Sequence, residues 1–126
     1  MKTLMSYLAV FALVLTSSFT INTQQKLNEK KATESFNHVR VHRQGKNVVV
    51  AWTVTTNDIA GFSIERSYDG DFFEEAGTAS PDGGSSYKYT DIGVFPGLIY
   101  YRIKAVKTDG STEYSPVETI RINQRG

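Results

Sequence analysis

The stretch VVVAWT at residues 48–53 decides the fold of this chain. Its β-branched residues and its tryptophan are typical of strands, and successive side chains of a strand point to opposite faces. Val48, Val50 and Trp52 therefore share one face, which we expect to be buried. An indole N–H usually has a partner when it is buried, so we expect a backbone carbonyl to accept from Trp52.

The same alternation of apolar and polar residues recurs in four further stretches: 38–42, 62–64, 87–89 and 98–106. Asp-Gly pairs at 69–70 and 109–110 favour tight turns, because both residues tolerate positive φ angles. Pro116 cannot donate to a ladder, so the last strand should lie at an edge. With no convincing helix, these patterns predict an all-β fold, a seven-stranded antiparallel β-sandwich. We expect a core of nine side chains: Val48, Val50, Trp52, Phe62, Ile64, Phe73, Tyr89, Tyr101 and Ile103.

Four motifs point to a known family of such sandwiches: Trp52, YTDIGV at 89–94, Pro96-Gly97 and YRIKAV at 101–106. Together they resemble a fibronectin type III domain, which has an immunoglobulin-like fold. Further motifs resemble a variant found in secreted bacterial proteins, often beside a sorting signal for type IX secretion: FSIERSYDGDFF at 62–73, YYRI at 100–103, Asp109-Gly110 and EYSP at 113–116. The family's corner hydrogen bond would come from Tyr100 or Tyr101, and strand parity favours Tyr101.

The N-terminus has the layout of a secretory signal peptide. Lys2 precedes an almost wholly apolar run from Leu4 to Leu15, and small residues follow. That run is shorter than the ~20 residues that span a bilayer, so an uncleaved anchor is the weaker alternative. The prediction is therefore export to the periplasm or the extracellular space. The expected divisions are a signal peptide at 1–25, cleaved between about 18 and 25, a flexible linker at 26–35, the fibronectin-like domain at 36–122 and a tail at 123–126. With only that tail after the sandwich, we expect a stand-alone module without a sorting domain.

Composition narrows the classes of partner. The chain has no cysteine, so neither disulfides nor a catalytic thiolate are available. Of its 14 Lys and Arg residues only Lys2 precedes Lys26, which leaves 13 against 13 Asp and Glu in the mature chain. A neutral chain without a basic run favours neither nucleic acid nor an acidic membrane surface as a partner.

For the candidate metal ligands, a structural role is preferred to metal binding. His38 and His42 share a face with Arg40, and a cation between two imidazoles disfavours a metal. Four acids are clustered, but they lack the spacing of a calcium loop: Asp69, Asp71, Glu74 and Glu75. We therefore expect no metal and no cofactor.

Charged side chains elsewhere indicate pairing rather than catalysis. Glu65 and Arg66 should pair across strands, which is the usual role of charges on a sheet. Neither histidine has a recognisable nucleophile partner, so the sequence predicts no catalytic residue and no enzyme.

Binding is the expected use of such a module. Tyr68, Phe72 and Phe95 lie in turns, and we expect at least one of them to be exposed. Such rings either contact a ligand or only cap the open ends of the sandwich, and the second interpretation is preferred because scattered exposed apolar residues are normal. The sequence predicts a non-catalytic binding or scaffolding module that contacts a protein. The alternative is a small carbohydrate-binding module, with a cell-surface glycan as the partner. Coplanar clustering of the three rings would favour sugar, whereas a long uncovered edge strand would favour protein.

Overall fold

The computed structural model describes residues 35–124 of the chain. The expected signal peptide, nearly all of the expected linker and the end of the expected tail lie outside these residues. Eight strands form the described part: β1 (Phe36–Gln44), β2 (Asn47–Val54), β3 (Ile59–Ser67), β4 (Glu74–Ala79), β5 (Ser86–Asp91), β6 (Gly97–Lys107), β7 (Thr112–Tyr114) and β8 (Glu118–Ile122). No helix that could cross a membrane occurs in this part of the chain.

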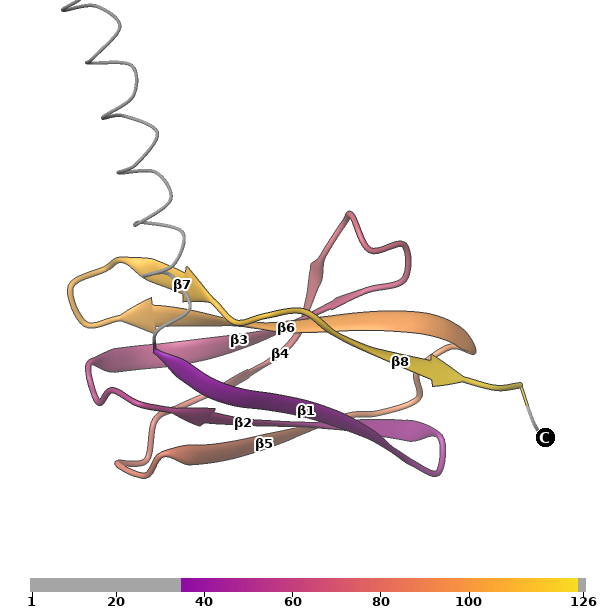
Figure 1. Ribbon diagram of the computed structural model, residues 1–126, viewed down its shortest axis with the longest axis horizontal. Coiled ribbons are helices and arrows are strands. Elements are labelled where there is room, and N and C mark those ends of the chain that lie inside the picture. Colours follow the sequence, from indigo (N-terminus) through magenta and orange to yellow (C-terminus); the bar gives the residue numbers. More distant parts are fainter. Residues whose placement is uncertain (1–34, 125–126) are drawn as a thin grey trace, which may run out of the picture. The chain divides into compact units, whose positions relative to one another are not determined.

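The strands form two antiparallel sheets that lie one above the other (Figure 1). One sheet has three strands in the order β1-β2-β5, and the other has five, in which β4, β3 and β6 are neighbours and β7 and β8 both pair with β6. The all-β, antiparallel character predicted from the sequence is therefore confirmed. Neighbours such as β2 and β5 are distant in sequence, so long-range pairing defines both sheets.

The strand count differs from the seven expected, because the last strand is interrupted. β7 pairs with β6 at Lys104–Val106 and β8 pairs with it at Gly97–Tyr101, and the chain between them contains Pro116. Proline has no N–H to donate to the ladder. At the break the backbone N–H of Ser115 donates to the carbonyl of Ile103 at 2.8 Å, and the Ser115 hydroxyl accepts from the Ile103 N–H at 2.8 Å.

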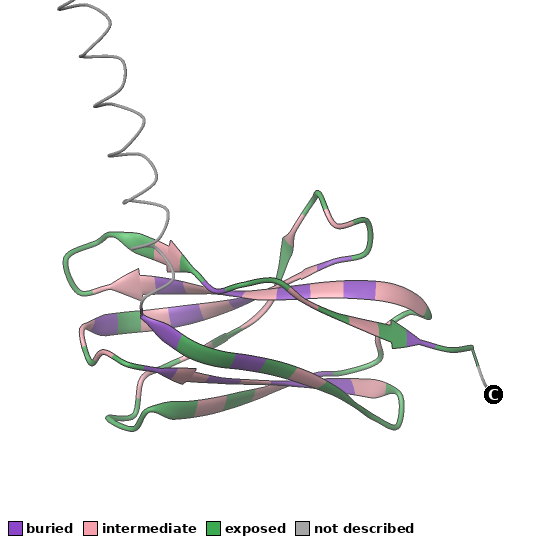
Figure 2. Cartoon of the chain, in the orientation of Figure 1, coloured by how far each residue is buried: buried purple, intermediate pink, exposed green. Residues whose placement is uncertain are grey.

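The core lies between the two sheets, where buried positions alternate along the strands (Figure 2). Trp52 is its largest side chain and meets the Phe62 ring edge-on, with the centroids 5.4 Å apart. The Tyr87 ring stacks on it at 5.8 Å. Seven of the expected core residues are buried there: Val48, Val50, Trp52, Phe62, Ile64, Tyr101 and Ile103.

The Trp52 N–H differs from the expectation, since no backbone carbonyl accepts from it. The indole Nε1 is buried without a hydrogen-bond partner. The rings of Phe62 and Tyr87 pack against the indole. Trp52 therefore contributes packing, not a hydrogen bond.

Phe73 was predicted to lie in the core, but in the structure it lies outside the core. Ile64 pairs with Gly77 but Glu65 pairs with Glu75, so Ala76 is an extra residue in β4, a β-bulge. A bulge reverses the phase of the residues beyond it, which turns Phe73 to the outer face. There its ring stacks on the Arg102 guanidinium at 4.1 Å.

Tyr89 is only half-buried and links the two sheets at one side. Its hydroxyl donates to the carbonyl of Ala76 at 2.9 Å, so β5 of one sheet is tied to β4 of the other. A Cβ at Gly77 would lie 2.3 Å from the Tyr89 ring carbon Cζ, so the close approach requires glycine. Tyr89 thus packs against the core on the side where β4 and β5 are the edge strands of their sheets.

Candidate functional site

Four large apolar side chains are exposed in two loops of the described chain. The β3–β4 loop carries Tyr68 and Phe72, and the β5–β6 loop carries Ile92 and Phe95. Phe72 is 74% exposed, Ile92 77% and Phe95 68%. Since β3 ends beside the beginning of β6, both loops lie at the same end of the fold. We call these four side chains the apolar end.

The two loops contact each other through Tyr68 and Phe95. Their ring centroids are 5.7 Å apart and their planes are inclined at 53°. The backbone N–H of Phe95 also donates to the Tyr68 hydroxyl at 3.3 Å. The two loops are therefore in direct contact, but these two rings are not coplanar.

The β3–β4 loop is held by its own polar groups. The Asp69 Oδ1 accepts from the backbone N–H groups of Asp71 and Phe72, both at 2.9 Å, and from the buried Ser67 hydroxyl at 2.9 Å. The N–H of Phe72 and then that of Asp71 lower the pKa of Asp69, because both hydrogen bonds favour the carboxylate. Gly70 adopts a φ of +84°, which favours glycine. The exposed ring of Phe72 thus stands on an ordered loop.

The β5–β6 loop is anchored to the β1–β2 turn. The N–H of Gly93 donates to the side-chain oxygen of Asn47 at 3.1 Å, and the N–H of Val94 donates to the carbonyl of Lys46 at 3.3 Å. Val94 packs against the core. These contacts fix the backbone on the N-terminal side of Phe95.

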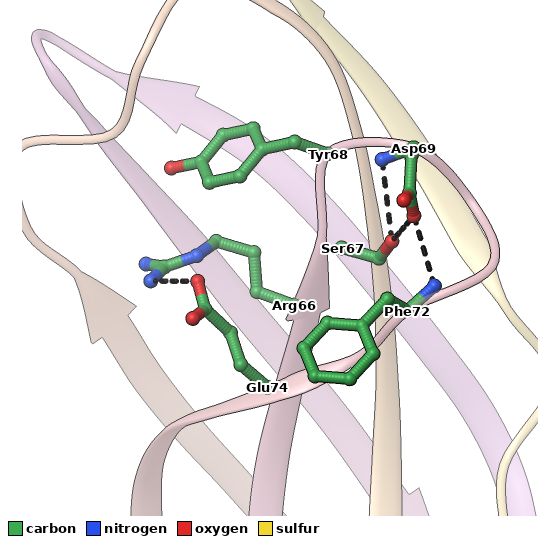
Figure 3. A pocket seen from close by; sticks show the side chains of 6 residues that line it. All are labelled: Arg66, Ser67, Tyr68, Asp69, Phe72 and Glu74. Carbon is green, nitrogen blue, oxygen red and sulfur yellow. Dashed lines mark hydrogen bonds and ion pairs between the residues drawn. The ribbon is translucent and has the colours of Figure 1, made fainter.

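A hollow of about 290 Å³ lies beside the β3–β4 loop (Figure 3). Six residues line it: Arg66, Ser67, Tyr68, Asp69, Phe72 and Glu74. Its wall therefore combines two aromatic rings with two carboxylates and one guanidinium. Such a mixed wall suits a ligand group with both apolar and polar parts.

A partly buried ion-pair network borders the hollow. The Arg66 Nη1 lies 2.7 and 2.8 Å from the two oxygens of Asp91, and its Nη2 lies 3.0 Å from the Glu74 Oε1. Burial opposes the charge on Arg66, but the hydrogen bonds with Asp91 and Glu74 outweigh burial and raise its pKa. Tyr101 donates to the Asp91 Oδ2 at 2.7 Å. Asp91 ends β5 and Arg66 belongs to β3, so the network joins the two sheets.

Glu65 and Arg66 of β3, which were predicted to pair across strands, both do so. Glu65 accepts from Arg102 of β6 at 2.7 Å, and Arg66 reaches Glu74 of β4. The Arg102 guanidinium also lies 4.3 Å from the Tyr114 ring, in addition to its contact with Phe73. Glu65, Arg102 and Tyr114 thus join β3, β6 and β7 on the outer face of the five-stranded sheet.

The structure brings the expected contacts Tyr68, Phe72 and Phe95 to one end of the fold. Ile92, the most exposed of the four, was not predicted from the sequence. Ile92 lies between Asp91, which ends β5, and Gly93. This position indicated its exposure, because an apolar residue in a glycine turn has no neighbouring strand to cover it.

The candidate metal ligands do not form a site. His38 and His42 pair with Thr53 and Val49 on the outer face of the three-stranded sheet. Among residues 35–124 no group of three or more His, Cys, Asp or Glu side chains is arranged to hold a metal ion. The Asp69 carboxylate instead accepts hydrogen bonds within its own loop.

A second hollow, of about 600 Å³, lies at the opposite end, between the β2–β3 and β4–β5 loops. Its lining is mainly small and polar: Val54, Thr55, Thr56, Asn57, Gly83, Gly84 and Ser85. It contains no aromatic side chain, so it offers no anchor comparable with Phe72.

No family model matches the chain, and no curated protein matches it. Solved structures resemble its fold. A pectate lyase, PelI from Erwinia chrysanthemi in complex with tetragalacturonic acid, matches 64% of this chain with a TM-score of 0.56 and 13% identity. A β-1,2-glucanase from Parabacteroides distasonis matches 75% with a TM-score of 0.54 and 19% identity.

A myokine structure matches 73% of this chain with a TM-score of 0.54 and 17% identity. The match covers 99% of the myokine chain, but only 27% of the pectate lyase and 13% of the glucanase. This chain therefore spans a minor part of both enzymes, and at such identities the likeness is one of fold alone.

Proposed function

We propose that residues 36–122 form a fibronectin type III-like, non-catalytic binding module that acts after export and contacts a protein partner through its apolar end. The motifs around Trp52 and the YRIKAV strand support the family. The pairing of β2 with β5 and of β3 with β6 also fits an immunoglobulin-like sandwich, in which strands distant in sequence are neighbours. Tyr101 departs from the family pattern, because its hydroxyl reaches a carboxylate rather than the backbone.

One observation supports the function above all: three large apolar side chains are mainly exposed on two ordered loops at one end. Aromatic side chains in such positions are the usual anchors of protein contacts. Holding them exposed costs hydration free energy, which a partner that covers them would recover. The inclined rings of Tyr68 and Phe95 favour a protein over the flat stacking that a sugar ring requires.

Site-specific photo-crosslinking tests this proposal. A photoreactive residue at Phe72 or Phe95 should capture a defined protein from the exported fraction of the native host. The same residue at Asp82, in the β4–β5 loop at the opposite end, is the matched control. Equal capture from all three positions would contradict a site at the apolar end.

The carbohydrate alternative is tested in parallel. An array that includes oligogalacturonates and β-1,2-glucan oligomers presents glycans of the kinds named for two of the similar structures. Binding to the array that Phe72→Ala abolishes would establish the alternative and overturn the protein-binding proposal.

A further inference from the structure

On its β3–β4 side, the apolar end carries a surplus of negative charge. Four carboxylates belong to its β3–β4 loop and the adjoining start of β4: Asp69, Asp71, Glu74 and Glu75. Asp69 and Glu74 line the hollow, whereas Glu75 accepts from the Ser63 hydroxyl at 2.8 Å on the outer face of the sheet. The hollow beside them contains one cation, Arg66. Both oxygens of the buried Asp91 lie within 2.8 Å of the Arg66 Nη1, so the charge of that cation is already balanced from below. A ligand in the hollow therefore meets a negative field.

Glu74 is the carboxylate best placed to meet a partner. Its side chain is 52% exposed and contacts Arg66 through Oε1. Glu74 and Phe72 both line the hollow (Figure 3). An exposed aromatic face next to a carboxylate attracts a cation by the ring quadrupole and by Coulomb attraction together.

We infer that the protein partner presents a lysine or arginine beside an apolar side chain to this end of the module. The apolar side chain packs on Phe72 and Phe95, while the cation lies over the hollow next to Glu74. A small organic cation alone would leave Ile92 and Phe95 uncovered, since they belong to the other loop. This inference rests on the proposed function and adds the chemical nature of the partner.

Three synthetic peptides test the inference: leucine alternating with lysine, with glutamine or with glutamate. Backbone amide shifts of the labelled protein report where each peptide binds, and fluorescence anisotropy gives the affinity. The lysine peptide should shift the amides of Gly70–Phe73, bind more tightly than the glutamine peptide, and weaken as salt is added. The glutamate peptide should not bind.

Variants of the protein separate charge from shape. Glu74→Gln keeps an acceptor for Arg66 but loses the charge, so affinity for the lysine peptide should fall about two- to fivefold, as for an exposed ion pair. Asp71→Asn, at an exposed position, should act in the same direction without touching the Arg66 pair. Phe72→Ala should weaken all binding more than about fivefold. Asp82→Asn makes the same charge change at the opposite end and should leave affinity unchanged.

The outcomes distinguish this inference from the proposed function. Equal affinity for the lysine and glutamine peptides, with the same amide shifts, would overturn the choice of a cationic partner and leave a protein-binding end intact. Failure of the lysine peptide to bind would also overturn it. If the photoreactive residue at Phe72 and at Phe95 captured no protein, that result would instead contradict the proposed function itself.

Discussion

The Tyr101 hydroxyl donates to the Asp91 carboxylate at 2.7 Å, and this contact lies where the two sheets meet beneath the candidate site. Asp91 is 4% exposed and also accepts from Arg66 through both oxygens. Burial and then the hydrogen bond to Asp91 raise the pKa of Tyr101, so its hydroxyl stays protonated as the donor. One carboxylate thereby fixes a residue of β3 and a residue of β6.

Replacing Asp91 should therefore destabilise the fold more than removing one hydrogen bond. Asp91→Asn leaves the largely buried Arg66 without its main counter-ion, at a cost of about 2–4 kcal/mol. Tyr101→Phe removes a single hydrogen bond to a charged group and should cost about 1–3 kcal/mol. Urea melts of both variants measure the two losses. If Asp91→Asn proved milder than Tyr101→Phe, the ion pair would contribute nothing to stability.

Gly77 should not tolerate a side chain while Tyr89 is present. The added Cβ would lie 2.3 Å from the Tyr89 ring, so the ring must move and lose its hydrogen bond to Ala76. Gly77→Ala should cost about 1–3 kcal/mol, as for overpacking. In a Tyr89→Ala background the same substitution should be nearly neutral. A double-mutant cycle of thermal melts measures the coupling, and simple additivity would contradict the contact.

The sequence predicted the fold well where local alternation determines burial. Val48, Val50 and Trp52 are buried because a strand's period of two is a local property. Phe73 shows where that reasoning fails. The bulge at Ala76 depends on how β4 pairs with β3, and no local pattern shows it. One extra residue was enough to turn Phe73 out of the core.

The candidate site was predicted less completely, for a related reason. Tyr68, Phe72 and Phe95 could be singled out as turn aromatics, but their gathering at one end depends on the pairing of β3 with β6. The Arg66–Asp91 pair joins residues 25 positions apart and crosses between the sheets. Cross-strand pairing rules could find the partners of Arg66 within its own sheet, such as Glu74, but not this one.

The order of the β3–β4 loop should depend on pH through Asp69. The backbone N–H groups of Phe72 and Asp71 lower the pKa of Asp69 in the folded protein. The stabilisation is therefore present above the unfolded pKa of about 3.9 and is lost as the pH falls through the lower folded value.

Hydrogen exchange by NMR provides the measurement for Asp69. Protection of the Phe72 and Asp71 amides should fall in that acid range, after correction for the intrinsic exchange rate. Asp69→Asn should remove this pH dependence, whereas Asp71→Asn, whose side chain is exposed, should retain it. Constant protection down to the lowest pH at which the fold survives would contradict a role for the Asp69 charge.

Because successive residues of β2 point to opposite faces, substitutions at two adjacent positions should differ strongly in their cost to the free energy of unfolding. Trp52 is 1% exposed at the centre of the core, so Trp52→Ala should cost about 3–5 kcal/mol, the usual loss for a buried aromatic side chain. Its N–H has no acceptor, so Trp52→Phe should cost clearly less, because only volume is lost. Thr53 points to the outer face, where its hydroxyl accepts from the His38 N–H at 3.2 Å. Water can replace that exposed contact, so Thr53→Ala should cost less than about 1 kcal/mol. Urea melts of the three variants give the comparison, and equal losses at positions 52 and 53 would be incompatible with a core between these two sheets.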